Sequence, residues 1–361
     1  DILGLPYVNV VCGSFLGTRY SRWWNNPSPL SYVPEYMTHF TDSMTFIQRL
    51  KNLYMHLLSL LVYDVIGLSS FDAIRDMWGK NQSSLSTRNI MGASSLYIMN
   101  WDFLMEYPRP VQPNVVLCGG MSVTEAKPLS QEFEAFMQGS GDEGVLVFSI
   151  STLVNNMDDK MADMIAGALA MLPFRVIWKY VNERQPATLG NNTLLASWIP
   201  QNDLLGHNKT KMFVFHGGVN GAYEAIFHGV PVVGIPLFAD QVDNMLRLRS
   251  RGMAEYFEGT IREVTTEWLY EEIMKVATNP SYTDNAELAS AIFRSQSQRP
   301  LERAVFWIEH VMAHGHEHLR SNRGDLTWVQ LNLWDIAGAF IAACVVLGLS
   351  LRVLLAHYIF E

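Results

Sequence analysis

Residues 198–244 decide the fold of this chain and read WIPQNDLLGHNKTKMFVFHGGVNGAYEAIFHGVPVVGIPLFADQVDN. Within this stretch, the apolar run 212–215 stops at His216, and a second apolar run follows at 230–235. The segment between them, residues 220–229, ends at a glycine and predicts a short helix. Strand, glycine turn, helix and strand in this order indicate a parallel α/β sheet.

The turn after the first apolar run suits a phosphate group. Gly217 and Gly218 have no Cβ, so the backbone there can come close to a ligand. Asn220 is a favoured N-cap residue, and as the start of the helix it would aim backbone N–H groups at the same space. Because helix N-termini attract anions, we expect a phosphate-binding site here.

Further strand and helix signals surround this unit. Apolar runs at 145–150 and 174–180 predict strands, and a helix is expected between them at 158–172. Amphipathic segments at 265–278 and 300–314 predict helices that close the domain. The pattern is typical of a doubly wound parallel sheet, in which ligands bind at the carboxyl ends of the strands.

Polar side chains at these strand ends are candidates for ligand binding. His216 could donate to a phosphate or be a structural histidine. Glu224 could accept from the vicinal hydroxyls of a ribose or be a solvated helix charge. Trp198 could stack on a flat base or belong to the core. Asp240 and Gln241 combine a carboxylate with an amide, which suits sugar hydroxyls.

Composition indicates a globular chain of two domains, because 361 residues with 49% hydrophobic side chains can bury a large core. The net charge of -9 argues against general nucleic-acid binding, which needs clustered Lys and Arg. Cys12, Cys118 and Cys344 are far apart and odd in number, so neither a disulfide framework nor a CxxC site is indicated. We expect buried thiols.

The C-terminal segment 336–360 is long and apolar enough to cross a bilayer as a single transmembrane helix. Arg352 interrupts it beyond the middle, which leaves a buried amphipathic helix as the alternative. Sequons at Asn81, Asn191 and Asn208 permit a lumenal or extracellular body. Residues 1–6 lack the pattern of a signal peptide, so we expect a chain that is missing its beginning.

The N-terminal part contains one strongly periodic helical segment. Its apolar residues keep helical spacing and are expected to pack in a core: Phe46, Leu50, Leu53, Leu57, Leu60 and Leu61. Prolines at 108, 110 and 113 then mark a stiff connection. We therefore place a domain boundary near residue 112.

Several blocks of the sequence resemble the UDP-glycosyltransferases of the animal UDP-glucuronosyltransferase type. They are SYVPEY at 31–36, EYPRPVQPNVVLCGG at 106–120, WIPQNDLLGH at 198–207 and LERAVFWIEH at 301–310. The likeness extends over nearly the whole chain. It implies a GT-B fold, which has two Rossmann-like domains facing a cleft, followed by the C-terminal membrane helix.

In that fold, residues 1–112 would be the remainder of an acceptor-binding domain. Residues 113–330 would bind the UDP-sugar, and 333–360 would hold the membrane helix and a short tail. The resemblance implies an inverting transfer of a sugar, glucuronic acid or else glucose or galactose, to hydroxyls of small lipophilic acceptors. The UDP-sugar is a co-substrate, no cofactor or metal is needed, and the body would face the lumen of the endoplasmic reticulum.

The resemblance also implies roles for individual donor-site residues. Trp198 would stack on uracil, Gln201 would lie near the base and ribose, and Glu224 would hold the ribose hydroxyls. The diphosphate would lie near the following residues: Ser149 and the turn after it, His216, Gly218, Asn220 and Gly221. Asp240 and Gln241 would hold the transferred sugar. This chain departs from the family in Ile150-Ser151-Thr152, where a glycine is usual, and in Phe215, where a threonine is usual.

No catalytic residue is assigned. The histidine base of the family and its aspartate would lie before Asp1, and His39 and His56 do not match their motif. We therefore expect weak donor binding without sugar transfer. The alternative function is a non-catalytic, membrane-anchored partner in a homo- or hetero-oligomer with full-length relatives.

Two other kinds of site are disfavoured. The histidines at 310, 314, 316 and 318 do not have the spacing expected of a zinc site. A Rossmann oxidoreductase would need GxGxxG after a strand, and the chain has no such motif there.

Overall fold

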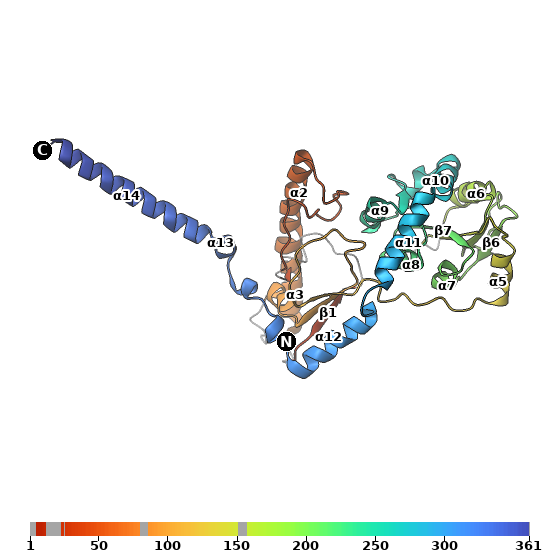
Figure 1. The fold of residues 1–361 in the computed structure, drawn as a ribbon, viewed down its shortest axis with the longest axis horizontal. Coiled ribbons are helices and arrows are strands. Elements are labelled where there is room, and N and C mark those ends of the chain that lie inside the picture. The colour runs from red at the N-terminus through yellow and green to blue at the C-terminus, as the bar shows by residue number, and fades with distance from the viewer. Residues whose placement is uncertain (1–4, 12–22, 25, 80–85, 151–156, 361) are drawn as a thin grey trace. The chain divides into compact units, whose positions relative to one another are not determined.

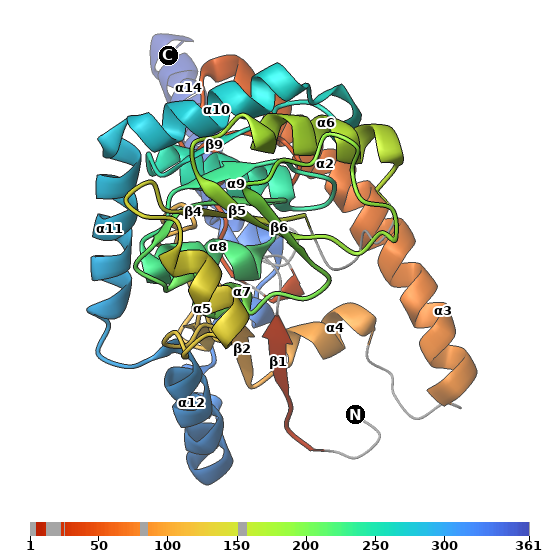
Figure 2. The same ribbon diagram turned by 90° about the vertical axis from the view of Figure 1, so that its right-hand side faces the viewer.

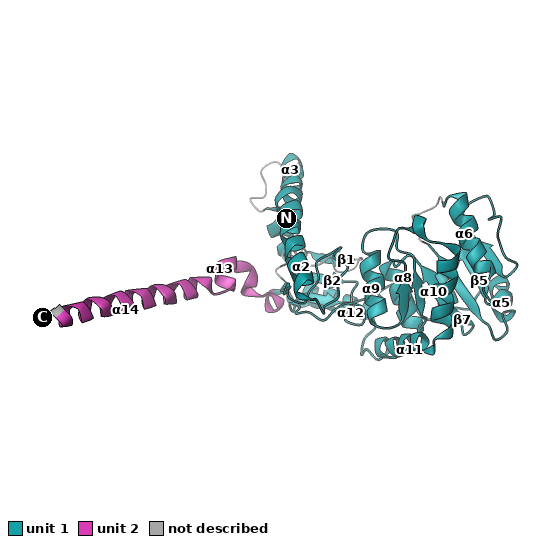
Figure 3. Ribbon diagram, turned by 90° about the horizontal axis from the view of Figure 1, so that it is seen from above, with its two compact units in different colours: residues 1–316 teal, residues 317–361 magenta. Residues whose placement is uncertain are grey.

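The structure is a computed structural model that describes residues 5–11, 23–24, 26–79, 86–150 and 157–360. It divides into two compact units, residues 1–316 and residues 317–361 (Figure 3). The first unit contains two parallel sheets, one of three strands and one of six (Figure 1). The predicted boundary near residue 112 is untested by this division and stays a prediction.

The three-stranded sheet has the order β1-β2-β3 and is parallel throughout. Its strands are β1 (Val8–Val11), β2 (Leu96–Met99) and β3 (Val115–Leu117). Trp24 stacks on Tyr97 of β2 with ring centroids 4.8 Å apart, and this pair belongs to a small aromatic core. Helix α12 (Pro300–His314), predicted at the same bounds, is tied to this sheet because Arg303 donates from Nη1 to the Leu117 carbonyl over 2.9 Å.

The six-stranded sheet has the order β6-β5-β4-β7-β8-β9, and all of its strands are parallel. Four strands lie where apolar runs predict them: β4 (Val145–Ser149), β5 (Arg175–Lys179), β7 (Thr210–Phe215) and β8 (Val232–Gly234). Two further strands were not predicted from the sequence: β6 (Thr193–Ala196) and β9 (Ala254–Tyr256). Both are edge strands, and both are short.

Alternate residues of the central strands point to opposite faces of this sheet, and each face is covered by helices. One face packs on α5 (Gln131–Gln138), α7 (Gln201–Leu205), α8 (Val219–His228), α9 (Gln241–Ser250) and α11 (Pro280–Arg294). The other packs on α6 (Asp159–Ala170) and α10 (Thr266–Thr278). Figure 2 shows α6 and α10 on one side of the strands and α7 and α8 on the other. This two-sided cover makes the central strands apolar along their whole length.

The predicted core role of the segment around residues 46–61 is wrong. This segment forms α2 (Phe46–Ser59), which continues through the π-helix η1 (Leu60–Gly67) into α3 (Leu68–Gly79). Its apolar side chains point away from the body of the protein, and Leu57 is 55% exposed. The side chains that it buries are polar, among them Asn52 and Ser59.

The second unit ends in the apolar helix α14 (Trp334–Phe360), which follows α13 (Trp328–Leu331) and two short 3₁₀ turns, η3 (Glu317–Leu319) and η4 (Asn322–Asp325). In the described part of the chain, two helical stretches are long and apolar enough to cross a membrane: Phe46–Met77 and Trp334–Ile359. None of the best window in the second stretch is buried. By its length and composition, this helix is therefore a candidate membrane span, as predicted.

Candidate functional site

The carboxyl ends of the central strands of the six-stranded sheet meet at one edge, as predicted. Ser149 at the end of β4 is paired with Phe215 at the end of β7, and Phe215 is paired with Gly234 at the end of β8. His216 follows β7 directly, so it lies beside Ser149. The turn after Ser149, residues 151–156, falls outside the described residues.

His216 is held tightly between the strand end and the glycine turn. Its side chain is hydrogen-bonded to the backbone of Ser149. A Cβ on Gly218 would lie only 2.6 Å from His216 Nε2, so the ring occupies the space that a side chain at 218 would need. Burial lowers the pKa of His216, against the opposing effects of the Ser149 hydrogen bond and the Asp240 charge. Burial thus favours the neutral form of the imidazole over the charged form.

The glycine turn requires glycine at position 217. Gly217 has a φ of 86°, in the left-handed region, and a Cβ there would lie 2.7 Å from the Gln241 carbonyl oxygen. The backbone can take this path because glycine has no side chain.

The predicted N-cap of α8 is wrong. Gly218 is the N-cap, with φ -66° and ψ 141°, and no side chain caps the helix. Asn220 lies inside the first turn, and its Oδ1 accepts from Asn100 Nδ2 over 3.1 Å. The backbone enters the helix two residues earlier than the Asn220 signal suggests, so a glycine of the turn takes the cap position. The helix N-terminus still opens at the strand ends, where its N–H groups suit an anion.

Gly221 faces the sheet in this helix. A Cβ on Gly221 would lie 3.0 Å from Phe215 Cδ2, so its lack of a side chain allows α8 to pack on the strand. Phe215, which stands where the family usually has a threonine, is fully buried and stacks on Phe213 at 4.6 Å. Its ring therefore belongs to the core, beneath the turn.

Gln201 and Glu224 come together from two helices. Gln201 Nε2 donates to Glu224 Oε2 over 2.5 Å, which links the first residue of α7 to the middle of α8. Burial raises the pKa of Glu224, and the hydrogen bond from Gln201 opposes this rise. Glu224 is thus a half-buried carboxylate with a fixed orientation, which excludes the alternative of a freely solvated helix charge.

Trp198 does not belong to the core. Its side chain is 71% exposed, and Lys179 Nζ lies 5.4 Å from the centroid of its ring. Lys179 is the last residue of β5, so this contact places the indole at the same edge of the sheet. A flat, exposed aromatic face beside a cation is suited to stacking on a base.

The segment before α9 carries Asp240 and Gln241. Asn244 Nδ2 donates to Asp240 Oδ2 over 3.0 Å and to the Gly217 carbonyl over 2.9 Å, which couples Asp240 to the glycine turn. Gln241 is buried, and its Oε1 accepts from the backbone N–H groups of Leu237 and Phe238 over 2.7 and 3.2 Å. The side-chain oxygen of Gln241 therefore stabilises the loop at residues 237–238. The role of Gln241 in binding a sugar stays a prediction.

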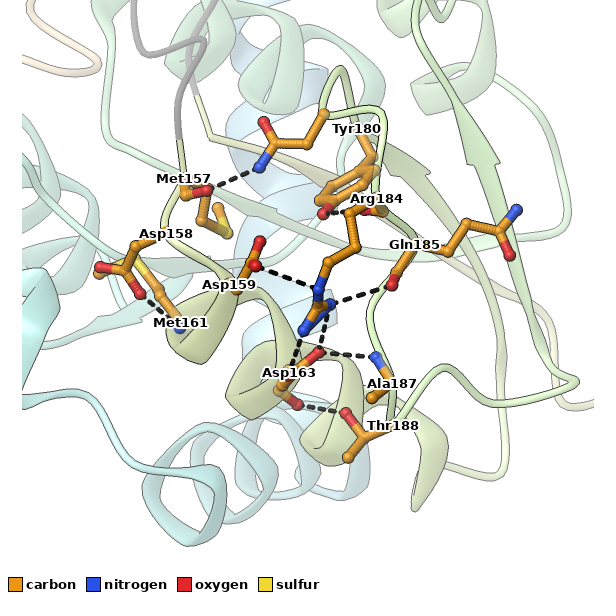
Figure 4. Close-up of polar contacts among 11 residues, drawn as sticks. Met157, Asp158, Asp159, Met161, Asp163, Tyr180, Arg184, Gln185, Ala187 and Thr188 are labelled. Carbon is orange, nitrogen blue, oxygen red and sulfur yellow. Dashed lines mark hydrogen bonds and ion pairs between the residues drawn. The ribbon is translucent and has the colours of Figure 1, made fainter.

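The loop that follows β5 is held against α6 by ion pairs and hydrogen bonds (Figure 4). Arg184 binds both carboxylate oxygens of Asp163 over 3.0 and 2.6 Å and also contacts Asp159 over 3.1 Å. Asn182 Nδ2 donates to the Met157 carbonyl over 2.6 Å. These contacts fix the loop that leaves Lys179 and borders a small hollow at the strand end.

The sequence did not indicate that residues of the N-terminal part, Met37 and His39, contact α9. Asp243 Oδ2 accepts from the Met37 backbone N–H over 3.1 Å, and Asp243 Oδ1 lies 3.3 Å from His39 Nδ1. The hydrogen bond with Asp243 raises the pKa of His39, although partial burial opposes this. Burial alone would raise the pKa of Asp243, but the His39 hydrogen bond and the Arg247 charge hold it below its ordinary value.

No pattern in the sequence predicts a contact between Met37 and Asp243, which are 206 positions apart.

A second histidine of the N-terminal part, His56, pairs with buried Glu35 over 3.2 Å. His310 and His314 lie with ring centroids 5.0 Å apart on α12. Across the ranges that the structure describes, no group of three or more His, Cys, Asp or Glu side chains is placed to hold a metal ion.

A family model described as UDP-glucoronosyl and UDP-glucosyl transferase matches residues 2–360. The chain belongs to this family. Its relatives include rabbit UDP-glucuronosyltransferase 2C1, which is 44% identical over 96% of this chain and 68% of its own length. Human UDP-glucuronosyltransferase 2A2 is 43% identical over 97% of this chain and 64% of its own length. The chain thus spans about two thirds of the length of these UDP-glycosyltransferases.

A neighbour of known structure supports the fold. The glycotransferase of kitacinnamycin superposes with a TM-score of 0.55, at 19% identity, over 74% of this chain and 67% of its own. The GT-B fold implied by the sequence blocks is confirmed, together with the parallel sheets and the C-terminal apolar helix.

Proposed function

We propose that the crevice at the ends of β4, β5, β7 and β8 binds UDP-glucuronate, and that the protein transfers the sugar to hydroxyls of small lipophilic acceptors. The observation that carries the proposal is the bond from Gln201 to Glu224, which fixes a half-buried carboxylate near the exposed ring of Trp198. A carboxylate accepts both vicinal hydroxyls of a ribose, and an exposed indole stacks on a base. Relatives named as UDP-glucuronosyltransferases support glucuronate as the sugar.

In this proposal, the residues at the glycine turn act on the diphosphate. The N–H groups at the start of α8 donate to the phosphate oxygens. His216, whose ring already donates to the Ser149 backbone, donates to them as well in its protonated form, which the charge of the diphosphate favours. When an acceptor oxygen attacks the anomeric carbon, the bond to the diphosphate breaks and negative charge grows on the UDP leaving group. Donors already aimed at that charge lower the barrier, since they need no reorganisation during the reaction.

Asp240 and Gln241 would contact the sugar, with Asp240 oriented by Asn244. Residues 113–330 would form the donor-binding domain and residues 1–112 part of the acceptor-binding domain. A test of the sugar assignment is the Gln241→Asn variant, which we expect to change the preference between UDP-glucuronate and UDP-glucose. An unchanged preference would remove Gln241 from the assignment.

The activity is tested with labelled UDP-glucuronate and a phenol acceptor in membranes that contain the chain. Formation of a labelled phenyl glucuronide, absent without acceptor, would support transfer. Absence of this product from membranes that bind UDP-glucuronate would overturn the transfer and leave the donor site in place.

A second candidate function is a membrane-anchored partner that binds donor but does not transfer it. It is favoured because His39 and His56 do not match the motif of the family's histidine base; they contact Asp243 and Glu35, respectively. Co-purification with a full-length relative, together with a change in the turnover of that relative, would support this function. Purification as a separate species with no effect on turnover would contradict it.

We also propose that α14 anchors the protein in the membrane of the endoplasmic reticulum with the body in the lumen. Asn191 and Asn208 are exposed in the body, whereas Asn81 falls outside the described residues. In a lumenal body these two sequons are open to glycosylation. A mobility shift on endoglycosidase treatment that disappears in the N191Q,N208Q variant would support the orientation, and its absence in the unmodified chain would count against it.

A further inference from the structure

The outward face of the long helix in the N-terminal part is apolar over many turns. α2, η1 and α3 run on continuously from Phe46 to Gly79. Six large apolar side chains along this face are between 41% and 60% exposed: Leu53, Leu57, Leu61, Val62, Val65 and Ile66. A contiguous apolar surface of this extent marks a site of contact with another apolar surface.

Three polar side chains of the same helix contact the body of the protein. Asn52 Nδ2 donates to the Leu30 and Val33 carbonyls, each over 3.0 Å. His56 Nδ1 lies 3.2 Å from Glu35 Oε2, and Asp64 Oδ1 accepts from Trp23 Nε1 over 2.7 Å. A helix on a water-facing surface has the opposite arrangement, with its apolar stripe toward the core. These inward contacts also fix one side of the helix on the protein, so the helix cannot cross a bilayer by itself.

The charges along the helix favour lipid over water or an acidic partner. Between Phe46 and Phe71 the sequence has three charged residues, Arg49, Lys51 and Asp64. The three charged residues that follow in α3 pair with one another: Asp72, Arg75 and Asp76. Asp64 is bound to Trp23, whereas Arg49 and Lys51 are exposed at the border of the apolar face. Cations beside an apolar face suit the phosphates of lipid headgroups, with the apolar residues in the acyl region below them.

We propose that the outward face of α2, η1 and α3 lies in the interfacial layer of a lipid bilayer as a contact separate from α14. The apolar helix α14 brings the chain to a membrane, so a lipid surface is available to the body. The contact is monotopic, because the polar side of the helix stays on the protein. This inference does not depend on the proposed transferase activity.

The test uses the full chain in bilayers, with the cysteines at 12, 118 and 344 replaced and a single cysteine introduced for an environment-sensitive NBD label. Labels at Leu57, Leu61 and Ile66 are compared with a label at Leu288, which is 59% exposed on α11. A chain that keeps Cys344 alone, in α14, is the reference for lipid contact.

We expect labels at 57, 61 and 66 to show blue-shifted emission and quenching by doxyl-labelled lipids, as at Cys344, while iodide quenches the label at 288. Quenching of the three labels by iodide would show a water-facing surface and overturn the proposal. Quenching by neither agent would show that protein covers the face, and it would overturn the proposal as well.

A charge variant tests the headgroup contact without changing the apolar face. The Lys51→Glu variant should reduce lipid quenching at Leu57, and the reduction should grow with the fraction of anionic lipid. Lys160→Glu, at an exposed position at the start of α6, is the matched control and should leave the quenching unchanged. Equal effects of the two variants would contradict a specific contact at Lys51.

Discussion

Glu106 and Arg247 form a buried ion pair, with Arg247 Nε 3.0 Å from Glu106 Oε2. Glu106 lies in the segment that follows β2, and Arg247 lies on α9. At the C-cap of α9, Arg251 Nη2 donates to the Phe103 and Glu106 carbonyls over 3.0 and 3.1 Å. The helix that begins beside Asp240 is therefore held at its far end by the segment after the three-stranded sheet.

The Arg247→Met variant tests this contact. It leaves the Glu106 carboxylate buried without its nearest cation, so the free energy of unfolding should fall by about 3–5 kcal/mol. Arg249→Met is the matched control on the same helix, because Arg249 pairs with the exposed Glu258 and should cost less than ~1 kcal/mol. In a double-mutant cycle with Glu106→Gln, the double variant should lose less than the sum of the single losses, and simple additivity would show that the two side chains are not coupled.

His39 and Asp243 should make the stability of the protein depend on pH. The folded-state pKa of His39 is raised, so its stabilising effect is complete below about pH 6.5, the ordinary value for histidine, and is lost as the pH rises through the folded-state value. The unfolding temperature of wild type should exceed that of His39→Asn at pH 6, and the difference should shrink toward pH 8.5. A difference that is constant over this range would contradict the charged pair.

The Gly218→Ala variant should weaken donor binding with little effect on the fold. The added Cβ would meet His216 Nε2 at 2.6 Å, so the ring must leave its place beside Ser149. Loss of one hydrogen bond to a charged phosphate costs about 1.5–3 kcal/mol, a decrease in affinity of roughly 10- to 150-fold. Gly167→Ala, whose Cβ would have no neighbour closer than 3.7 Å, is the control for titration calorimetry with UDP. Equal affinities of the two variants for UDP would show that His216 does not bind the phosphate.

Trp198→Ala should lower the affinity for UDP and leave the stability unchanged, because the side chain is 71% exposed. Stacking of a base on an aromatic ring is worth ~1–3 kcal/mol. Trp198→Phe should recover part of the loss, and Trp328→Ala, at another exposed tryptophan, should have no effect. A loss of affinity in Trp198→Ala that phenylalanine does not reduce at all would argue against stacking.

The sequence predicted the central strands and the composition of the site, because apolar runs and the glycine turn are local signals. It placed the cap at Asn220 and not at Gly218, since propensity cannot show where the backbone turns into the helix. The edge strands β6 and β9 are too short to produce a clear pattern. The helical spacing of apolar residues correctly predicted α2. It did not show which way the apolar face points, because a face toward the core and a face away from it have the same periodicity. The pairs of α9 join distant segments, and only the fold reveals them.

Titration calorimetry of the full chain in lipid nanodiscs with UDP, comparing wild type with Glu224→Gln, tests the donor site most directly. The variant keeps the size of the side chain but removes the charge that would accept the ribose hydroxyls, and Glu267→Gln at an exposed position of α10 is the control. Saturable binding to wild type and to the control, weakened roughly 10- to 150-fold in Glu224→Gln, is the predicted result, from about 1.5–3 kcal/mol for hydrogen bonds to a charged group. Absence of binding to wild type, or equal affinity in all three proteins, would contradict a UDP-sugar site built on Glu224.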